Sequence, residues 1–168
     1  VDKLKQSKRI ALLVSPMLSC EDAWLLGGLV RSIDNGAIIG VGPVPTVGED
    51  KTFKSGFTIR SEKAPNARGV QRALGDPLEY GEWKKQAGSA DTVVVTGNYP
   101  EAWDTPEIAD NQTLILIDTL ANELTQRADV FLPSATWAEK SGTFENYNNK
   151  LQLFEQAIHP LGDSQAEG

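Results

Sequence analysis

Five short apolar runs, several of them rich in β-branched residues, recur along the chain, and polar or turn-forming residues close each one. Continuous apolar runs of this length are typical of strands that are buried on both faces of a sheet. The segments between several of them have a helical pattern, which favours a parallel sheet with helices on both faces. The predicted strands are residues 10–14, 37–42, 91–96, 113–117 and 129–132.

A helical pattern follows the first run, from Glu21 to about Ile33. Ser19 and Asp22 stand at the N-cap and N3 positions, which is a weaker variant of the capping box. Gly36 is expected to end the helix. The pair Gly27–Gly28 favours close packing of the helix backbone on a sheet, and a poorly stable helix is the rival interpretation. The predicted inner stripe of this helix is Trp24, Gly27, Val30 and Ile33.

The rest of the chain is less regular. Further helices are predicted over residues 66–74, 77–87, 106–110 and 120–127, whereas residues 44–65 have no sustained period and are predicted as an extended excursion. Beyond Pro133 the pattern changes to two short runs, 143–146 and 151–154, around a turn rich in asparagine. Asparagine tolerates the positive φ of tight turns, so this segment is predicted to be a β-hairpin.

Together these patterns predict an α/β fold: a Rossmann or flavodoxin-like parallel sheet with helices on both faces and a C-terminal β-hairpin extension. The length of 168 residues fits one domain. Its predicted parts are a first β-α-β unit (1–42), an irregular excursion (43–65), the remaining α/β part (66–132), and a charged loop, hairpin and tail (133–168).

Charge and composition exclude several classes of partner. A net charge of −7, from 16 basic and 23 acidic side chains, argues against a nucleic-acid surface, which needs clustered cations. We interpret the basic cluster at Lys3, Lys5, Lys8 and Arg9 as a solvated lead-in. No apolar run approaches the ~20 residues of a membrane helix, so no direct membrane insertion is expected. The ends of the chain favour a piece excised from a longer polypeptide, with N-terminal processing as the alternative.

The sequence predicts no catalytic residue and no metal site. The single cysteine, Cys20, cannot hold an iron–sulfur cluster alone, because such clusters need about four thiolates. We interpret Cys20 as a small, partly buried residue at a helix start, or as a mildly activated thiol. His159 has no second histidine beside it.

Ligands of open parallel sheets bind beyond the carboxyl ends of the strands, where the strand order reverses. The loop of residues 97–100 is a candidate for such a site, although a simple turn is the alternative. Asp118 follows the next strand, and we interpret it either as a group that contacts a ligand or as a helix N-cap. Thr136 and Glu139 have capping-box spacing. Glu139 and the adjacent Lys140 are interpreted as a solvated pair of opposite charges.

The stretch between Ala128 and Gln152 resembles a segment of the molybdopterin oxidoreductase superfamily, A-D-V-x-L-P-x-x-x-x-x-E-x-x-G-T-x-x-N-x-x-x-R-x-Q. Lys150 stands where that family has arginine. Residues 57–66, ahead of an Arg-Gly-Val helix, are similar to the large (G) subunit of NADH–quinone oxidoreductase, respiratory complex I. The matching positions are Ala128, Asp129, Val130, Leu132, Pro133, Glu139, Gly142, Thr143, Asn146 and Gln152.

The resemblance implies that the loop at residues 97–100 and the carboxylate of Asp118 lie where that family holds the nucleotide end of a pterin cofactor. The family's T-E-T cluster corresponds to residues 121–123 here and retains only Glu123. The loss of both threonines of that cluster is in keeping with the complex I subunit, whose corresponding domain resembles the pterin enzymes in fold without doing their chemistry. The resemblance implies a set of residues that either bind the nucleotide part of the pterin or are the vestige of such a site. They are Gly97, Asn98, Pro100, Asp118, Glu123, Ser134, Glu139, Gly142 and Thr143.

The resemblance therefore implies a structural domain with no redox centre of its own. Its parent would be an oxidoreductase that passes electrons from NADH through iron–sulfur clusters to quinone. Its partners would be other domains of the same large subunit and other complex I subunits, on the cytoplasmic face of the inner membrane. Two alternatives stay open: a domain that binds molybdopterin guanine dinucleotide in a molybdenum or tungsten enzyme such as a formate dehydrogenase, and a stand-alone flavodoxin-like binding module.

Overall fold

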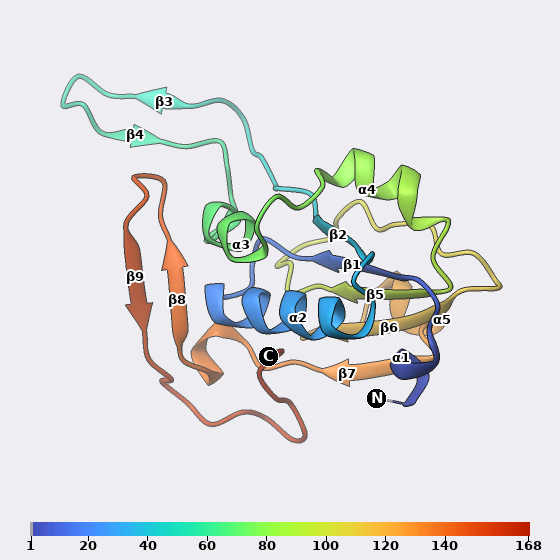
Figure 1. The fold of residues 1–168 in the computed structure, drawn as a ribbon. Helices are drawn as coiled ribbons and strands as arrows, with labels where there is room; N and C mark the ends of the chain where they lie inside the picture. Colours follow the sequence, from blue (N-terminus) through green and yellow to red (C-terminus); the bar gives the residue numbers. More distant parts are fainter. Residues whose placement is uncertain (1) are drawn as a thin grey trace.

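Five parallel strands form the central sheet of the computed structural model, which describes residues 2–168 (Figure 1). Val1, at which the chain opens, lies outside the described residues. The order in the sheet is β2-β1-β5-β6-β7, and each of the five predicted strands is confirmed to within a residue at either end. The bounds are β1 (Ile10–Val14), β2 (Ile38–Val41), β5 (Thr92–Thr96), β6 (Thr113–Asp118) and β7 (Val130–Pro133).

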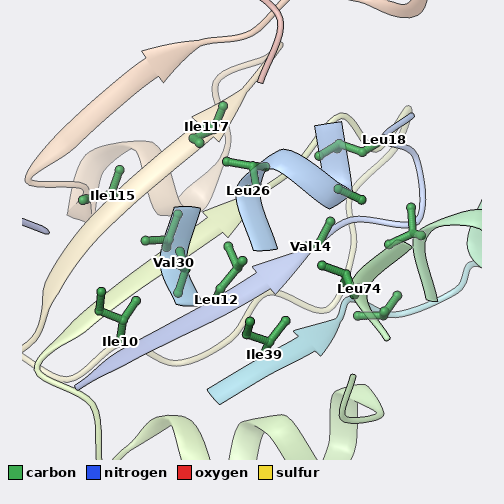
Figure 2. Packing of buried hydrophobic residues seen from close by; sticks show 14 residues of the cluster. Ile10, Leu12, Val14, Leu18, Leu26, Val30, Ile39, Leu74, Ile115 and Ile117 are labelled. Carbon is green, nitrogen blue, oxygen red and sulfur yellow. The ribbon is translucent and has the colours of Figure 1, made fainter. Parts of the chain in front are cut away.

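Helices cover both faces of this sheet, as predicted. Successive side chains of a strand point to opposite faces, so β1, β2, β5 and β6 each contribute to two cores. The edge strand β7 is largely exposed and adds only Val130 to one of them. On one face, Leu12 and Ile115 pack against α2 (Cys20–Ile33) and α3 (Ala67–Leu74) (Figure 2). On the other face, the fully buried Trp83 of α4 (Tyr80–Ala87) and Leu124 of α5 (Glu123–Arg127) pack against the intervening residues.

The start of α2 is confirmed, but its predicted inner stripe is partly wrong. The hydroxyl of Ser19 accepts a hydrogen bond from the backbone N–H of Asp22, at 3.1 Å. Trp24 lies 64% exposed, because the helix turns a different stripe toward the core. The helix ends at Ile33, three residues before Gly36. The buried residues of α2 are Asp22, Ala23, Leu26, Gly27 and Val30.

The two glycines of α2 have different surroundings. A Cβ on Gly27 would lie 2.8 Å from Cδ2 of Leu74 in α3, whereas a Cβ on Gly28 would meet nothing within 4 Å. Close packing at Gly27 is therefore confirmed, but against a neighbouring helix rather than the sheet.

Several helix boundaries differ from the sequence prediction. α4 begins at Tyr80, because Leu78 is still hydrogen-bonded to β2: its N–H donates to Ile39 and its carbonyl accepts from Val41. α5 begins at Glu123, where Asn122 caps it. Residues 106–110 form no helix, in keeping with the marginal stability of a single turn. Residues 2–6 form a short helix that was not predicted, α1 (Asp2–Gln6), and the basic residues Lys3, Lys5, Lys8 and Arg9 are exposed, as expected of a solvated lead-in.

Two hairpins project from the same end of the molecule (Figure 1). The predicted hairpin is confirmed as β8 (Gly142–Glu145) and β9 (Leu151–Phe154), and Asn149 in its turn has φ of 57°. Residues 44–65 contain a second, unpredicted hairpin of β3 (Lys51–Thr52) and β4 (Thr58–Ile59). The centroid of the Tyr147 ring lies 3.5 Å from the guanidinium carbon of Arg60, which follows β4, and 4.7 Å from that of Arg68 in α3. Tyr147 thus links the β8–β9 hairpin to both segments.

Within residues 2–168, no helix combines the length and the apolar character that crossing a bilayer requires.

Candidate functional site

The strand order reverses between β1 and β5, the place where open parallel sheets bind ligands. A cleft of about 510 Å³ opens at the carboxyl edge there, between loops that follow β1, β5, β6 and β7. Most of its exposed wall is apolar, with two lysines among the lining residues. The residues that line it are Met17, Lys63, Pro65, Asn98, Tyr99, Pro100, Thr119, Leu120, Thr136, Trp137, Lys140 and Phe144.

The loop after β5 is held rigidly at this edge. Gly97 packs so closely on Asp118 that an added Cβ would lie 1.7 Å from a carboxylate oxygen. Asn98 has φ of 66°, a left-handed conformation that asparagine tolerates. The Tyr99 hydroxyl donates to the carbonyl of Pro43 at 3.0 Å, and its ring stacks on Trp103. Burial raises the pKa of Tyr99, so the phenol stays protonated and remains a donor.

Asp118, the implied acidic residue, is 3% exposed, and protein donors surround its carboxylate. Oδ1 accepts from the backbone N–H groups of Asn98 and Thr119, at 2.8 and 2.7 Å. Oδ2 accepts from the side-chain amide of Asn122 at 2.6 Å. The helix N-cap interpretation is wrong, because Asn122 caps α5. Asp118 instead ties the loop after β5 to the loop after β6.

The loop after β7 has the predicted capping box. It begins a 3₁₀ turn, η1 (Trp137–Glu139), and the Glu139 carboxylate accepts from both the backbone N–H and the hydroxyl of Thr136, at 2.8 and 2.9 Å. The N–H of Thr136 lowers the pKa of Glu139. Glu139 also accepts from the N–H of Leu161 at 3.1 Å, so it organises the loop and the tail.

The hairpin residues of the implied set lie against the start of α2. The backbone N–H and the hydroxyl of Thr143 donate to Glu21, at 2.8 and 2.6 Å. A Cβ on Gly142 would lie 2.7 Å from Cβ of Ser19. Glu123 stands apart from them in the first turn of α5. These contacts give Gly142 and Thr143 a part in joining the hairpin to the α/β core.

Lys140 corrects another expectation. It was interpreted as half of a solvated pair with Glu139, but it is only 7% exposed. Its ammonium group donates to Asp22 of α2 at 2.8 Å and to Glu167 in the tail. Asp22 also accepts from the Ser19 hydroxyl at 2.7 Å. One buried cation therefore joins three segments that are far apart in the sequence.

Glu167 completes this arrangement, and sequence reasoning missed it. Its carboxylate accepts from the side-chain amide of Asn98, from the Ser134 hydroxyl at 2.6 Å, and from Lys140. The tail is also fixed by its backbone, since the N–H of Ala135 donates to the carbonyl of Gln165 at 2.7 Å. No local motif marks Glu167, because its partners lie 27 to 69 positions away.

The structure thus brings together part of the implied site. Asn98, Asp118 and Ser134 lie at one edge, and they are joined there by Lys140 and Glu167, which the sequence did not single out as site residues. The donors and acceptors that would face a nucleotide are bonded to other parts of the chain.

Few side chains among residues 2–168 are candidates for metal binding or thiol chemistry. Among residues 2–168, no group of three histidine, cysteine or acidic side chains lies close enough to hold a metal ion. Cys20 is the first residue of α2 and is partly buried, as expected. Burial raises the pKa of its thiol, which contradicts the alternative of an activated thiol.

Three polar side chains of this edge are not free to bind a guanine dinucleotide. A nucleotide base or phosphate would need Asp118, Asn98 or Ser134 as a free partner. Both oxygens of Asp118 are bonded to protein donors, and the amide of Asn98 and the hydroxyl of Ser134 are bonded to Glu167. In this arrangement these three side chains are already engaged within the chain.

Comparison with known proteins finds a family that this part of the chain resembles. The family model described as molybdopterin oxidoreductase matches residues 85–167, just under half of the chain. Residues 85–167 are therefore similar to the molybdopterin oxidoreductase family. The match includes β5, β6, β7 and the β8–β9 hairpin, and every residue of the implied site lies within it.

Similar proteins in other organisms belong to the same superfamily. The chain is 43% identical over 51 residues to the alpha subunit of an F420-dependent formate dehydrogenase of Methanocaldococcus jannaschii, and the match covers 30% of this chain and 8% of that protein. It is 37% identical over 54 residues to a nitrate reductase of Symbiobacterium thermophilum, covering 32% and 7%. It is 40% identical over 47 residues to the G subunit of an NADH–quinone oxidoreductase of Streptomyces coelicolor, covering 28% and 6%. The matched stretches span less than a tenth of these relatives.

Proposed function

We propose that this chain is a structural α/β domain in the large subunit of an NADH–quinone oxidoreductase, with no redox centre in this segment. The observation that carries the proposal is that buried polar side chains of the carboxyl edge are bonded within the chain. Asp118 is fully bonded within the chain, and Glu167 engages Asn98 and Ser134. A buried polar group that already has its partners gains little from a ligand, because binding must first break the existing bonds.

The exposed apolar surface supports a packing role. The outer face of α2 carries Trp24, Leu25 and Leu29, which are 64%, 45% and 50% exposed. In the β8–β9 hairpin, Leu151 and Leu153 are 68% and 84% exposed. Apolar surface of this kind is typical of sites that pack against other protein. Its occupants in the proposed role are other domains of the same large subunit and other subunits of the complex, peripheral on the cytoplasmic face of the inner membrane.

A second candidate function is the binding of molybdopterin guanine dinucleotide in a molybdenum or tungsten oxidoreductase. The formate dehydrogenase and nitrate reductase names among the relatives favour it. So does the meeting of Asn98, Asp118 and Ser134 at the edge where ligands of such sheets bind. In this arrangement Glu167 would have to leave before a nucleotide could reach Asn98 and Ser134.

Titration of the purified chain with guanine nucleotides separates the two candidates. We expect isothermal titration calorimetry with GMP and GDP to show no specific binding, with AMP as the matched control. Micromolar binding of GMP that AMP does not reproduce would contradict the structural role and support the cofactor-binding candidate. Equal weak responses to all three nucleotides would reflect non-specific association and would leave the structural role standing.

A further inference from the structure

We propose that the carboxyl edge contains an anion site, formed by the amide of Asn98, the hydroxyl of Ser134 and the ammonium of Lys140, and that the carboxylate of Glu167 fills this site. Glu167 then acts as a strap that holds the tail across the edge. The chemical class of the ligand is a carboxylate. The inference rests on the proposed structural role, because that role requires the edge to stay closed.

The three donors are suited to a carboxylate. One oxygen of Glu167 accepts from Asn98 and Ser134, and the other accepts from Lys140. Hydrogen bonds from a cation to a carboxylate are among the strong ones in proteins. The Glu167 side chain is fully buried, so water does not compete for these donors.

The ammonium of Lys140 is shared between Glu167 and a second carboxylate. Lys140 donates to Asp22 as well as to Glu167, so one cation faces two carboxylates. Lysine has three donor hydrogens, which lets it serve both. If Glu167 is truncated, Asp22 keeps the ammonium paired, while the donors of Asn98 and Ser134 face a hole the size of a carboxylate.

The hydrogen bonds around Ser134 indicate a strap rather than an isolated ion pair. Gln165 bridges to Ser134 in parallel register, and its N–H donates to the carbonyl of Pro133 at 3.2 Å. A Cβ on Gly168 would lie 3.1 Å from Cα of Asp22, so the tail reaches the first turn of α2. In Figure 1 the C-terminus lies beside α2. Release of Glu167 would therefore leave the backbone bonds of Gln165 to Pro133 and Ala135 to hold the tail at the end of β7.

Chemical rescue tests the anion site. Glu167→Ala should lower the melting temperature by roughly 5 °C at neutral pH, and sodium acetate should restore about half of that loss. Sodium chloride at the same ionic strength should restore none of it. Wild type and Glu167→Gln should show no acetate effect, because a side chain of full size still fills the hole. Absence of acetate rescue in a folded Glu167→Ala variant would overturn the proposal.

Two further variants keep the test decisive. The double variant Glu167→Ala/Lys140→Met should lose the acetate response, and a response that survives would show that acetate acts elsewhere. If Glu167→Ala does not fold, Ser134→Ala removes one donor and leaves the Lys140–Asp22 pair intact. Backbone amide exchange of residues 164–168 should then become at least several-fold faster, with β1 and β5 unchanged. Unchanged exchange in the tail would overturn the strap.

The outcomes separate this inference from the proposed function. Acetate rescue without GMP binding supports both. No acetate rescue together with no GMP binding removes the anion site and leaves the structural role. Specific GMP binding by the wild-type chain removes the structural role, whatever acetate does.

Discussion

The two edges of the central sheet both use carboxylates to bind donors, but in opposite environments. At the amino edge, Asp91 accepts from the backbone N–H of Lys8 at 2.9 Å, and Asp129 accepts from that of Leu114 at 2.8 Å. These bonds are exposed or partly so. At the carboxyl edge, Asp118 and Glu167 are buried, and Glu167 is paired with a buried lysine.

The difference between the two edges indicates where single substitutions should lower the free energy of unfolding most. Exposed charges interact weakly because water screens them, so the caps of the amino edge contribute little each. A buried charge has lost its hydration and depends on every remaining partner. We therefore expect substitutions at the carboxyl edge to lower stability more than substitutions at the amino edge. The carboxyl edge is also where sheets of this class bind ligands, and in this chain several of its polar groups are bonded to one another.

The largest effect is expected for Lys140→Met. This variant leaves Asp22 and Glu167 buried together without their cation, and breaking a buried pair in this way costs about 3–5 kcal/mol. Urea unfolding measures the change in free energy. The matched control is Lys85→Met, since Lys85 is exposed and pairs with Glu82 one turn away. A loss at Lys140 no larger than the loss at Lys85 would show that the two edges do not differ as described.

Gly97→Ala should rank second. The added methyl would lie 1.7 Å from the buried Asp118 carboxylate, and relief requires the loop after β5 to move. Overpacking of this kind costs about 3 kcal/mol at the upper end of its range. Gly88→Ala is the control, because a Cβ there meets nothing within 4 Å. Thermal unfolding of the two variants, measured side by side, decides whether Gly97 is required by the space around it.

The sheet could be predicted from the sequence because its signal is local. Four of the strands are continuous apolar runs, such as residues 10–14, that are buried on both faces, and such runs are visible in the sequence. The edge strand β7 has the same type of run but is mostly exposed. The β8–β9 hairpin was equally predictable from its asparagine-rich turn. The β3–β4 hairpin was not, because each of its strands is two residues long and leaves no period to detect.

The carboxyl edge could be predicted only in part. The doubly wound pattern indicated that Asn98, Asp118 and Ser134 would meet there, and they do. Lys140 was misread because a lysine next to a glutamate in a loop has the pattern of a solvated pair. Its burial depends on Asp22 and Glu167, which lie 118 and 27 positions away. Sequence spacing carries no information on such contacts until the fold is known.

Gly142→Val tests the packing between the β8–β9 hairpin and the start of α2, next to the carboxyl edge. A Cβ there would lie 2.7 Å from Ser19, which caps α2, and 2.8 Å from the ring of Phe154. We expect a loss of about 2 kcal/mol from overpacking, because both neighbours are held in place. Differential scanning calorimetry measures the loss. A melting temperature equal to that of wild type would show that the hairpin can shift away from α2 at little cost.

The smallest effect is expected at the amino edge, from Asp129→Asn. The backbone N–H of Leu114 holds the pKa of Asp129 below its usual value. The carboxylate therefore stabilises the fold above its unfolded pKa of about 3.9, and this contribution is lost as the pH falls through the lower folded pKa. Because the group is exposed and screened, the difference from wild type should stay below about 1 kcal/mol.

Urea unfolding from about pH 6 down to about pH 2 tests the sign as well as the size of this effect. The stability difference between wild type and Asp129→Asn should be constant above about pH 4 and shrink below it. Asp110→Asn, which changes an exposed aspartate, serves as the control. A difference that persists at the lowest pH would assign the effect to the shape of the side chain rather than its charge. A difference as large as that of Lys140→Met would mean that the amino edge is as sensitive to a lost charge as the carboxyl edge.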